Sequence, residues 1–126
     1  MYSDGSPTRT FCYISDAITG YLKALLYAQT GFDAFNIGID KPEISIRRLA
    51  EIYSEAGREI FGYTGQAKFG VSSDSEYLKN NPNRRCPDIT KARKLLNYDP
   101  KIDVEQGVRL FLQHIRETSS EEALTW

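Results

Sequence analysis

The chain has 126 residues, a formal net charge of −1 and 40% hydrophobic residues, which suits one domain with a modest core. The balanced charge argues against binding nucleic acid or an anionic membrane through a global field. No apolar run is long enough for a transmembrane helix, and the N-terminus has no secretory pattern, so we expect a cytoplasmic protein with no membrane partner. The two distant cysteines and single histidine provide neither a disulfide framework nor a metal-ligand spacing.

The chain begins with a predicted strand followed by a predicted helix. Residues 9–14 are rich in aromatic and β-branched side chains, which favour a strand. Apolar residues then recur at helical spacing until shortly before Gly31, and Ser15 or Asp16 is the expected N-cap. These residues predict one strand-helix unit.

The same order of elements is then repeated. Residues 34–39 are a short apolar run and predict a second strand. Ser45 is a favourable N-cap for the helix that follows, and Gly57 is the expected end of that helix. Residues 67–71 suggest a third strand, and residues 72–83 are polar and predict a surface loop, with one helical turn suggested near 76–78.

Two helices are predicted in the last third of the chain. Thr90 is the expected N-cap of a short helix that ends at Asn97. Asp103 followed by Gln106 has the form of a capping box before the last helix. Alternating strands and helices indicate an α/β fold. We expect one lobe over residues 1–118 and a flexible tail over residues 119–126.

The chain offers few candidates for a catalytic site. No G-x-G-x-x-G motif follows a predicted strand, so no dinucleotide phosphate loop is expected. No tyrosine is followed by a lysine four residues later, and His114 is expected to be a solvated helix residue. The residues therefore predict no catalytic, cofactor-binding or metal-binding group.

A local concentration of positive charge is the most informative feature. Residues 79–94 contain six basic residues and one acidic residue, Asp88. The adjacent Arg84 and Arg85 could offer planar guanidinium groups to a diphosphate. The alternative is a solvated basic loop.

Three blocks in this chain follow the order and approximate spacing of a known family. They are Asp4-Gly5-Ser6-x-Thr8-Arg9-x-Phe11-x-Tyr13-Ile14-x-Asp16, Phe35-Asn36-Ile37-Gly38 and Arg84-Arg85-x-Pro87-Asp88-Ile89-x-Lys91-Ala92-x-x-Leu95-Leu96. The chain resembles the C-terminal part of the extended short-chain dehydrogenase/reductases that act on nucleotide sugars. The third block looks most similar to the UDP-glucuronate decarboxylase branch, and the 4,6-dehydratases and 4-epimerases are the alternatives.

The resemblance implies roles for individual residues. Arg9 and Arg85 match two arginines that bind the diphosphate in such enzymes, and Asp88 matches the acidic residue that accepts hydrogen bonds from the ribose. Guanidinium groups suit phosphate oxygens, and a carboxylate suits vicinal hydroxyls. The alternatives are an ion pair between Arg9 and Asp16 and a helix-capping role for Asp88. Arg84 is expected to be the exposed, dispensable member of the arginine pair.

Two further positions are family-typical candidates for substrate binding. Tyr13 could instead fill the core, and Asn36 could instead end a strand. The implied ligand is a nucleotide sugar linked to UDP or dTDP.

The resemblance also implies that the N-terminal dinucleotide-binding sheet is absent. NAD belongs to the full-length parent, and we expect this chain to bind no cofactor and catalyse nothing alone. In such enzymes, segments like residues 9–14 and 35–38 lie against the missing half, so the chain should expose apolar surface and could form a homo-oligomer. The alternative is a non-enzymatic nucleotide-binding or oligomerisation module derived from the family. A nucleic-acid-binding domain is disfavoured, since no basic recognition helix is present.

Overall fold

The computed structural model describes residues 4–28, 31–70 and 82–122. In chain order its elements are β1 (Thr8–Arg9), α1 (Ile14–Leu25), β2 (Ile44–Ser45), α2 (Ile46–Phe61), β3 (Arg84–Arg85), α4 (Thr90–Leu96) and α5 (Val104–Glu122). The predicted α/β class is confirmed. No helix among the described residues is long and apolar enough to cross a membrane.

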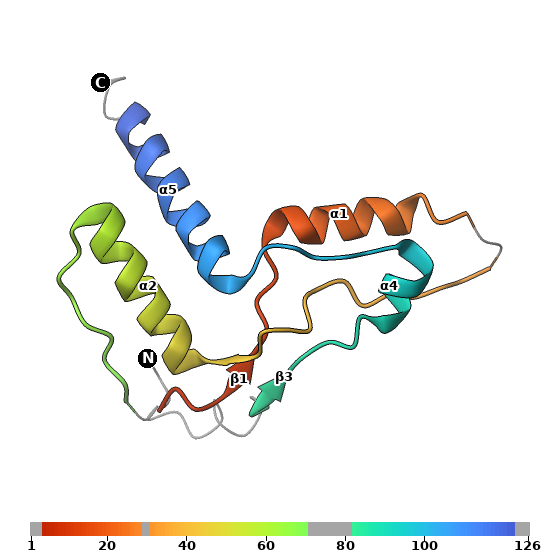
Figure 1. Ribbon diagram of the computed structural model, residues 1–126, viewed down its shortest axis with the longest axis horizontal. Helices are drawn as coiled ribbons and strands as arrows, with labels where there is room; N and C mark the ends of the chain where they lie inside the picture. The colour runs from red at the N-terminus through yellow and green to blue at the C-terminus, as the bar shows by residue number, and fades with distance from the viewer. Residues whose placement is uncertain (1–3, 29–30, 71–81, 123–126) are drawn as a thin grey trace.

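The three strands form one small sheet with β1 in the middle (Figure 1). β2 pairs with β1 in antiparallel orientation, and β3 pairs with β1 in parallel orientation. The parallel register places Thr8 opposite Arg84 and Arg9 opposite Arg85. The sheet therefore joins the start of the chain to the basic segment.

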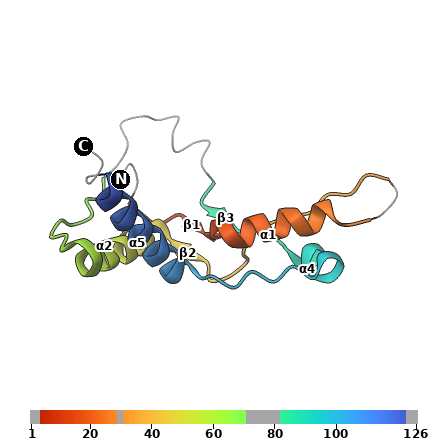
Figure 2. The same ribbon diagram turned by 90° about the horizontal axis from the view of Figure 1, so that it is seen from above.

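Helices α2 and α5 pack against each other at one end of the molecule (Figures 1 and 2). Their contact surface contains a buried cluster of apolar residues, namely Ile52, Ala56, Val104 and Val108. An ion pair between Arg48 and Glu105, 2.8 Å long, also joins the two helices. Helical periodicity explains this packing because it places the apolar residues of each helix on one face.

Helices α1 and α4 form the other end of the molecule (Figure 2). A second buried cluster lies here and consists of Ile89, Ala92, Leu96 and Tyr98. Gly20 allows α1 to come close to it, because a Cβ at this position would lie 2.5 Å from Ile37 and 2.9 Å from Tyr98. The two apolar clusters are thus at opposite ends of the molecule.

Of the two strands predicted near the start of the chain, one was too long and the other is not present. Only Arg9 of the predicted strand over residues 9–14 belongs to β1, and α1 starts at Ile14 with Tyr13 as its N-cap. Residues 34–39 form no strand. A strand requires a hydrogen-bonded neighbour, and sequence pattern alone does not supply one.

Helix α2 begins after Ser45 as predicted, since the Ser45 hydroxyl accepts a hydrogen bond from the Arg48 amide at 3.0 Å. The predicted end at Gly57 was wrong. Gly57 is buried against Tyr63, and the helix continues to Gly62, which has the left-handed backbone (φ 67°) that a helix terminus uses.

The later elements are mostly as predicted. Helix α4 ends at Asn97, although Ile89 and not Thr90 is its N-cap. Asp103 accepts a hydrogen bond from the Gln106 amide at 2.9 Å, which caps α5.

The described residues cover only part of the predictions for residues 67–83 and for the C-terminal tail. Residues 67–70 are not a strand. Residue 71, most of the predicted 72–83 loop and the suggested turn at 76–78 lie outside the described residues. Helix α5 extends to Glu122, so residues 119–122 are helical and the expected boundary after residue 118 falls inside a helix.

Candidate functional site

The sheet brings Arg9 and Arg85 together. They are directly opposite each other in the parallel pair, and the Thr10 amide donates a hydrogen bond to the Arg85 carbonyl at 3.3 Å. Neighbouring strands lie about 4.8 Å apart, and opposite residues in a parallel pair project to the same face. The two candidate diphosphate ligands are therefore side by side, although they are far apart in sequence.

A groove of about 820 Å³ runs along this part of the sheet. Arg9, Arg84 and Arg85 contribute to its walls, and its other lining residues include Phe11, Ile37, Gly38 and Pro87. The groove is thus cationic along one side and apolar elsewhere. Such a surface suits a ligand with an anionic group beside a less polar one.

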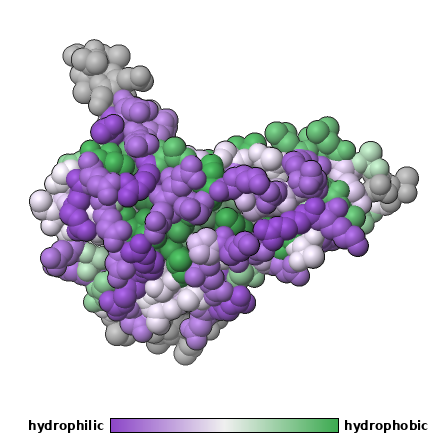
Figure 3. Space-filling view, in the orientation of Figure 1, coloured by the Kyte–Doolittle hydropathy of each residue, from purple (hydrophilic) through white to green (hydrophobic). Residues whose placement is uncertain are grey.

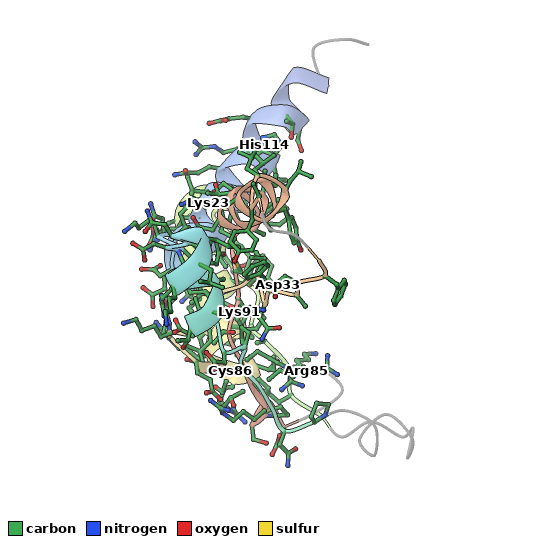
Figure 4. The ribbon with its side chains drawn as sticks, turned by 90° about the vertical axis from the view of Figure 1, so that its right-hand side faces the viewer. Lys23, Asp33, Arg85, Cys86, Lys91 and His114 are labelled. Atoms are coloured by element: carbon green, nitrogen blue, oxygen red, sulfur yellow. The ribbon has the colours of Figure 1, made fainter. Side chains whose placement is uncertain are left out.

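The two adjacent arginines make different contacts. Arg84 is ion-paired with Glu43, with its Nε 3.0 and 2.9 Å from the two carboxylate oxygens. Arg85 is exposed, and in the described part of the chain its side chain makes no ion pair or hydrogen bond. Figure 4 shows Arg85 on the strand layer, well apart from the Lys91 and Asp33 pair. Arg84 is exposed, as expected, but it makes an ion pair with Glu43.

Arg9 is fixed by backbone oxygens. Its guanidinium donates to the Thr8 carbonyl and to the Pro82 carbonyl, each at 2.7 Å. Asp16, the alternative partner considered for Arg9, instead accepts hydrogen bonds from the amides of Lys101 and Ile102 at 2.9 and 2.8 Å. Arg9 is thereby held against the residues that lead into β3.

Asp88 makes the capping contact that was its alternative role. Its Oδ1 accepts a hydrogen bond from the Thr90 amide at 2.9 Å, at the start of α4. Hydrogen bonds from Thr90 hold the pKa of Asp88 below its usual value. The Asn36 side chain donates to the Asp88 carbonyl at 3.0 Å. Asp88 and Asn36 are therefore coupled to each other, but neither lines the groove that contains the arginines.

Tyr13 lies in a different place. It packs on α5, where a Cβ at Gly107 would be 3.1 Å from its ring. It lines a mostly apolar cavity of about 510 Å³ that Leu49, Tyr53 and Phe111 also line. The structure thus groups Arg9 with Arg85 and Asn36 with Asp88, and leaves Tyr13 apart from both pairs.

Helix α1 exposes a row of large apolar side chains. The exposed fractions are 61% for Ile14, 49% for Ile18 and 80% for Leu25. Figure 3 shows hydrophobic residues gathered over α1 on the visible face. This row recurs at helical spacing, so the hydrophobic stripe predicted for this helix faces outward and is not buried.

Comparison with known proteins places the fold in a class. No protein-family model matches the chain. The solved structure of UDP-glucuronic acid 4-epimerase from Bacillus cereus, in complex with UDP-glucuronic acid and NAD, superposes with a TM-score of 0.73 at 28% identity. The match covers 94% of this chain and 35% of that one. The fold is that of the C-terminal part of a Rossmann-type epimerase.

Sequence relatives narrow the class to a family. The chain is 31% identical over 117 residues to UDP-glucuronic acid decarboxylase 4 of Arabidopsis thaliana, which covers 93% of this chain and 24% of that protein. It is 31% identical over 112 residues to UDP-glucuronate 4-epimerase of Thermodesulfobacterium geofontis, covering 86% of this chain and 30% of that protein. The chain is thus homologous to part of the extended short-chain dehydrogenase/reductases of nucleotide sugars, and the resemblance seen in its motifs is confirmed.

Proposed function

We propose that residues 1–118 form the lobe that binds the nucleotide diphosphate of a UDP- or dTDP-linked sugar. The observation that carries this proposal is the parallel register that sets Arg9 opposite Arg85. Both side chains line one groove, and Arg85 keeps its guanidinium available. Two planar cations at this spacing suit a diphosphate better than a single phosphate.

The residues of this chain do not fit NAD. A dinucleotide needs a glycine-rich turn between a strand and a helix N-terminus. The segment from β1 to α1 contains no glycine, and Gly20, Gly38 and Gly107 each face a neighbouring side chain. We propose that this chain binds the nucleotide end of the substrate and that hydride transfer requires residues from elsewhere.

The proposed partner is the N-terminal dinucleotide-binding half found in this family. The chain spans about a third or less of the relatives and solved structures it matches. The exposed stripe of α1 is a surface that such a half would cover. In this arrangement the chain contributes substrate binding and orientation, while catalysis depends on its partner.

Titration with UDP and UMP tests the diphosphate site. An isolated lobe with two arginine contacts should bind UDP in the roughly millimolar range and UMP more weakly. Arg85→Ala should weaken UDP binding about tenfold and leave UMP binding nearly unchanged, because the charge that distinguishes UDP from UMP is on the second phosphate. Chemical-shift titration or calorimetry would measure both.

The matched control is Arg58→Ala, which removes an exposed arginine of α2 that does not line the groove. It should leave the affinities for UDP and UMP as they are. Equal affinity of the wild-type chain for UDP and UMP, or equal losses in Arg58→Ala and Arg85→Ala, would contradict the proposed site.

A further inference from the structure

One carboxylate contacts or adjoins all three strands of the sheet. Glu43 directly precedes β2, accepts a hydrogen bond from the Thr8 hydroxyl of β1 and pairs with Arg84 of β3. The Arg84–Glu43 pair includes a 2.8 Å contact from a terminal guanidinium nitrogen, and only 25% of the Glu43 side chain is exposed. Thr8 and Arg84 are themselves opposite each other in the sheet. Glu43 therefore links the strands at the pair formed by Thr8 and Arg84.

Strand β3 has few other contacts to keep it in place. It is two residues long and pairs only with β1 among the described strands. The backbone hydrogen bonds that flank this pairing run from Thr8 to the Asn83 carbonyl at 2.8 Å and from Thr10 to the Arg85 carbonyl at 3.3 Å. A strand this short is weakly specified by its ladder alone. A side-chain contact can therefore decide its register.

The contact with Arg84 also determines where Arg85 points. Successive residues of a strand project to opposite faces, so a one-residue slip would move Arg85 away from Arg9. Because Glu43 holds Arg84 and Thr8 on one face, Arg85 and Arg9 share the other face. Arg84 thus determines the direction of the Arg85 side chain indirectly, through the register of β3.

We propose that Glu43 is a positioning residue that holds Arg85 beside Arg9 through Arg84 and Thr8. The effect on ligand binding rests on the proposed diphosphate site, whereas the effect on strand pairing does not.

A role of Glu43 through its charge alone and a role in positioning Arg85 predict opposite effects of Glu43→Gln on UDP binding. Removing a carboxylate close to an anion site would strengthen diphosphate binding if charge alone mattered. If Glu43 positions Arg85, the same change weakens UDP binding. The direction of the change therefore separates the two roles.

The test compares Glu43→Gln with the wild-type chain in two measurements. In the absence of ligand, the Thr8 and Thr10 amides, which donate to residues in or next to β3, should exchange with solvent about fivefold faster. In a UDP titration the affinity should fall about fivefold, with UMP binding nearly unchanged. The control is Glu59→Gln, which removes the ion pair with Arg109 between α2 and α5 and should alter neither measurement.

Two further variants keep the proposal testable if Glu43→Gln does not fold. Thr8→Val removes one Glu43 contact without changing charge and should show the same changes in smaller degree. The charge-swapped Glu43→Arg/Arg84→Glu variant should recover slow exchange and UDP binding.

Unchanged amide exchange or tighter UDP binding in Glu43→Gln would overturn the positioning role. If the wild-type chain does not distinguish UDP from UMP, the proposed function fails, and amide exchange still decides whether Glu43 positions β3.

Discussion

The fold strongly affects the chemical state of Tyr98. It is 1% exposed, and its hydroxyl donates to the Gly38 carbonyl at 2.9 Å. Its oxygen also lies 3.6 Å from the Cys12 sulfur. Burial raises the pKa of Tyr98 far above its ordinary value, and burial also raises the pKa of the Cys12 thiol. Both groups therefore stay protonated in the folded chain at pH values where the unfolded chain releases their protons.

This arrangement predicts alkaline destabilisation. The stabilisation from Tyr98 is fully present below about pH 10, the pKa of an unfolded tyrosine, and is lost as pH rises toward its higher folded pKa. Tyr98→Phe should reduce this loss, with the part due to Cys12 remaining. At neutral pH the variant should be about 1–3 kcal/mol less stable, since the Gly38 carbonyl loses its buried donor.

Urea unfolding at about pH 7 and about pH 10.5 measures both effects. The control is Tyr53→Phe, because Tyr53 is 40% exposed and lies outside the buried cluster that contains Tyr98. If Tyr98→Phe and Tyr53→Phe showed the same pH dependence, the assignment to Tyr98 would be wrong.

The sequence predicted part of the candidate site. The family resemblance singled out Arg9 and Arg85, and the structure places these two residues opposite each other in neighbouring strands. The sequence offered a capping role for Asp88 as an alternative, and this contact is present. Glu43 was not predicted, because its partners lie in two other strands and nothing in the local pattern around it reveals their register.

At the scale of elements, the local sequence pattern was sufficient to predict helices and insufficient to predict strands. Ser45, Asn97 and Asp103 cap helices where predicted, because a cap depends only on its immediate neighbours. Residues 34–39 have the composition of a strand, but no strand among the described residues pairs with them. Gly57 was mistaken for a helix end because its burial depends on tertiary packing.

The exposed face of α1 predicts self-association. Ile18 and Leu25 are 49% and 80% exposed and lie on the same face of the helix. Exposed apolar rows of this kind drive association in water. The double variant Ile18→Gln/Leu25→Gln should shift the chain toward monomer while keeping its helix content, because glutamine is a good helix former.

Sedimentation velocity over a range of concentrations measures this shift. Phe61→Gln is the control, since Phe61 is 48% exposed but lies on α2, away from the row. A wild-type chain that is monomeric at all concentrations, with one cooperative thermal transition, would contradict the prediction.

At the scale of the whole molecule, the chain is the smaller part of what its relatives contain. It covers 24% of one related decarboxylase and 35% of a solved epimerase that binds NAD. The resemblance to the C-terminal part of the family implied this, and the absence of a glycine-rich loop, which is a local motif, agrees with it. The contact with a dinucleotide-binding half was predicted for residues 9–14 and 35–38 only through the resemblance, since a contact between surfaces leaves no pattern in one segment.

We therefore expect the isolated chain to bind no NADH. Fluorescence titration up to about millimolar NADH should give no saturable enhancement, because none of the helices in the described ranges begins after a glycine-rich turn. The UDP titration of the same sample shows that it is competent to bind a nucleotide. A saturable NADH signal that UDP does not displace would refute the expectation.

The groove has walls from both ends of the molecule. Phe11 packs against the cluster between α2 and α5, Ile37 packs against the cluster beside α4, and both residues line the groove. Residues that share no packed neighbours are energetically independent, so the two clusters have little reason to form or open together. A ligand held by Arg9 and Arg85 would touch both walls and favour the state in which both clusters are formed. Substrate would then act as a thermodynamic link between two halves of a core that the chain itself leaves separate.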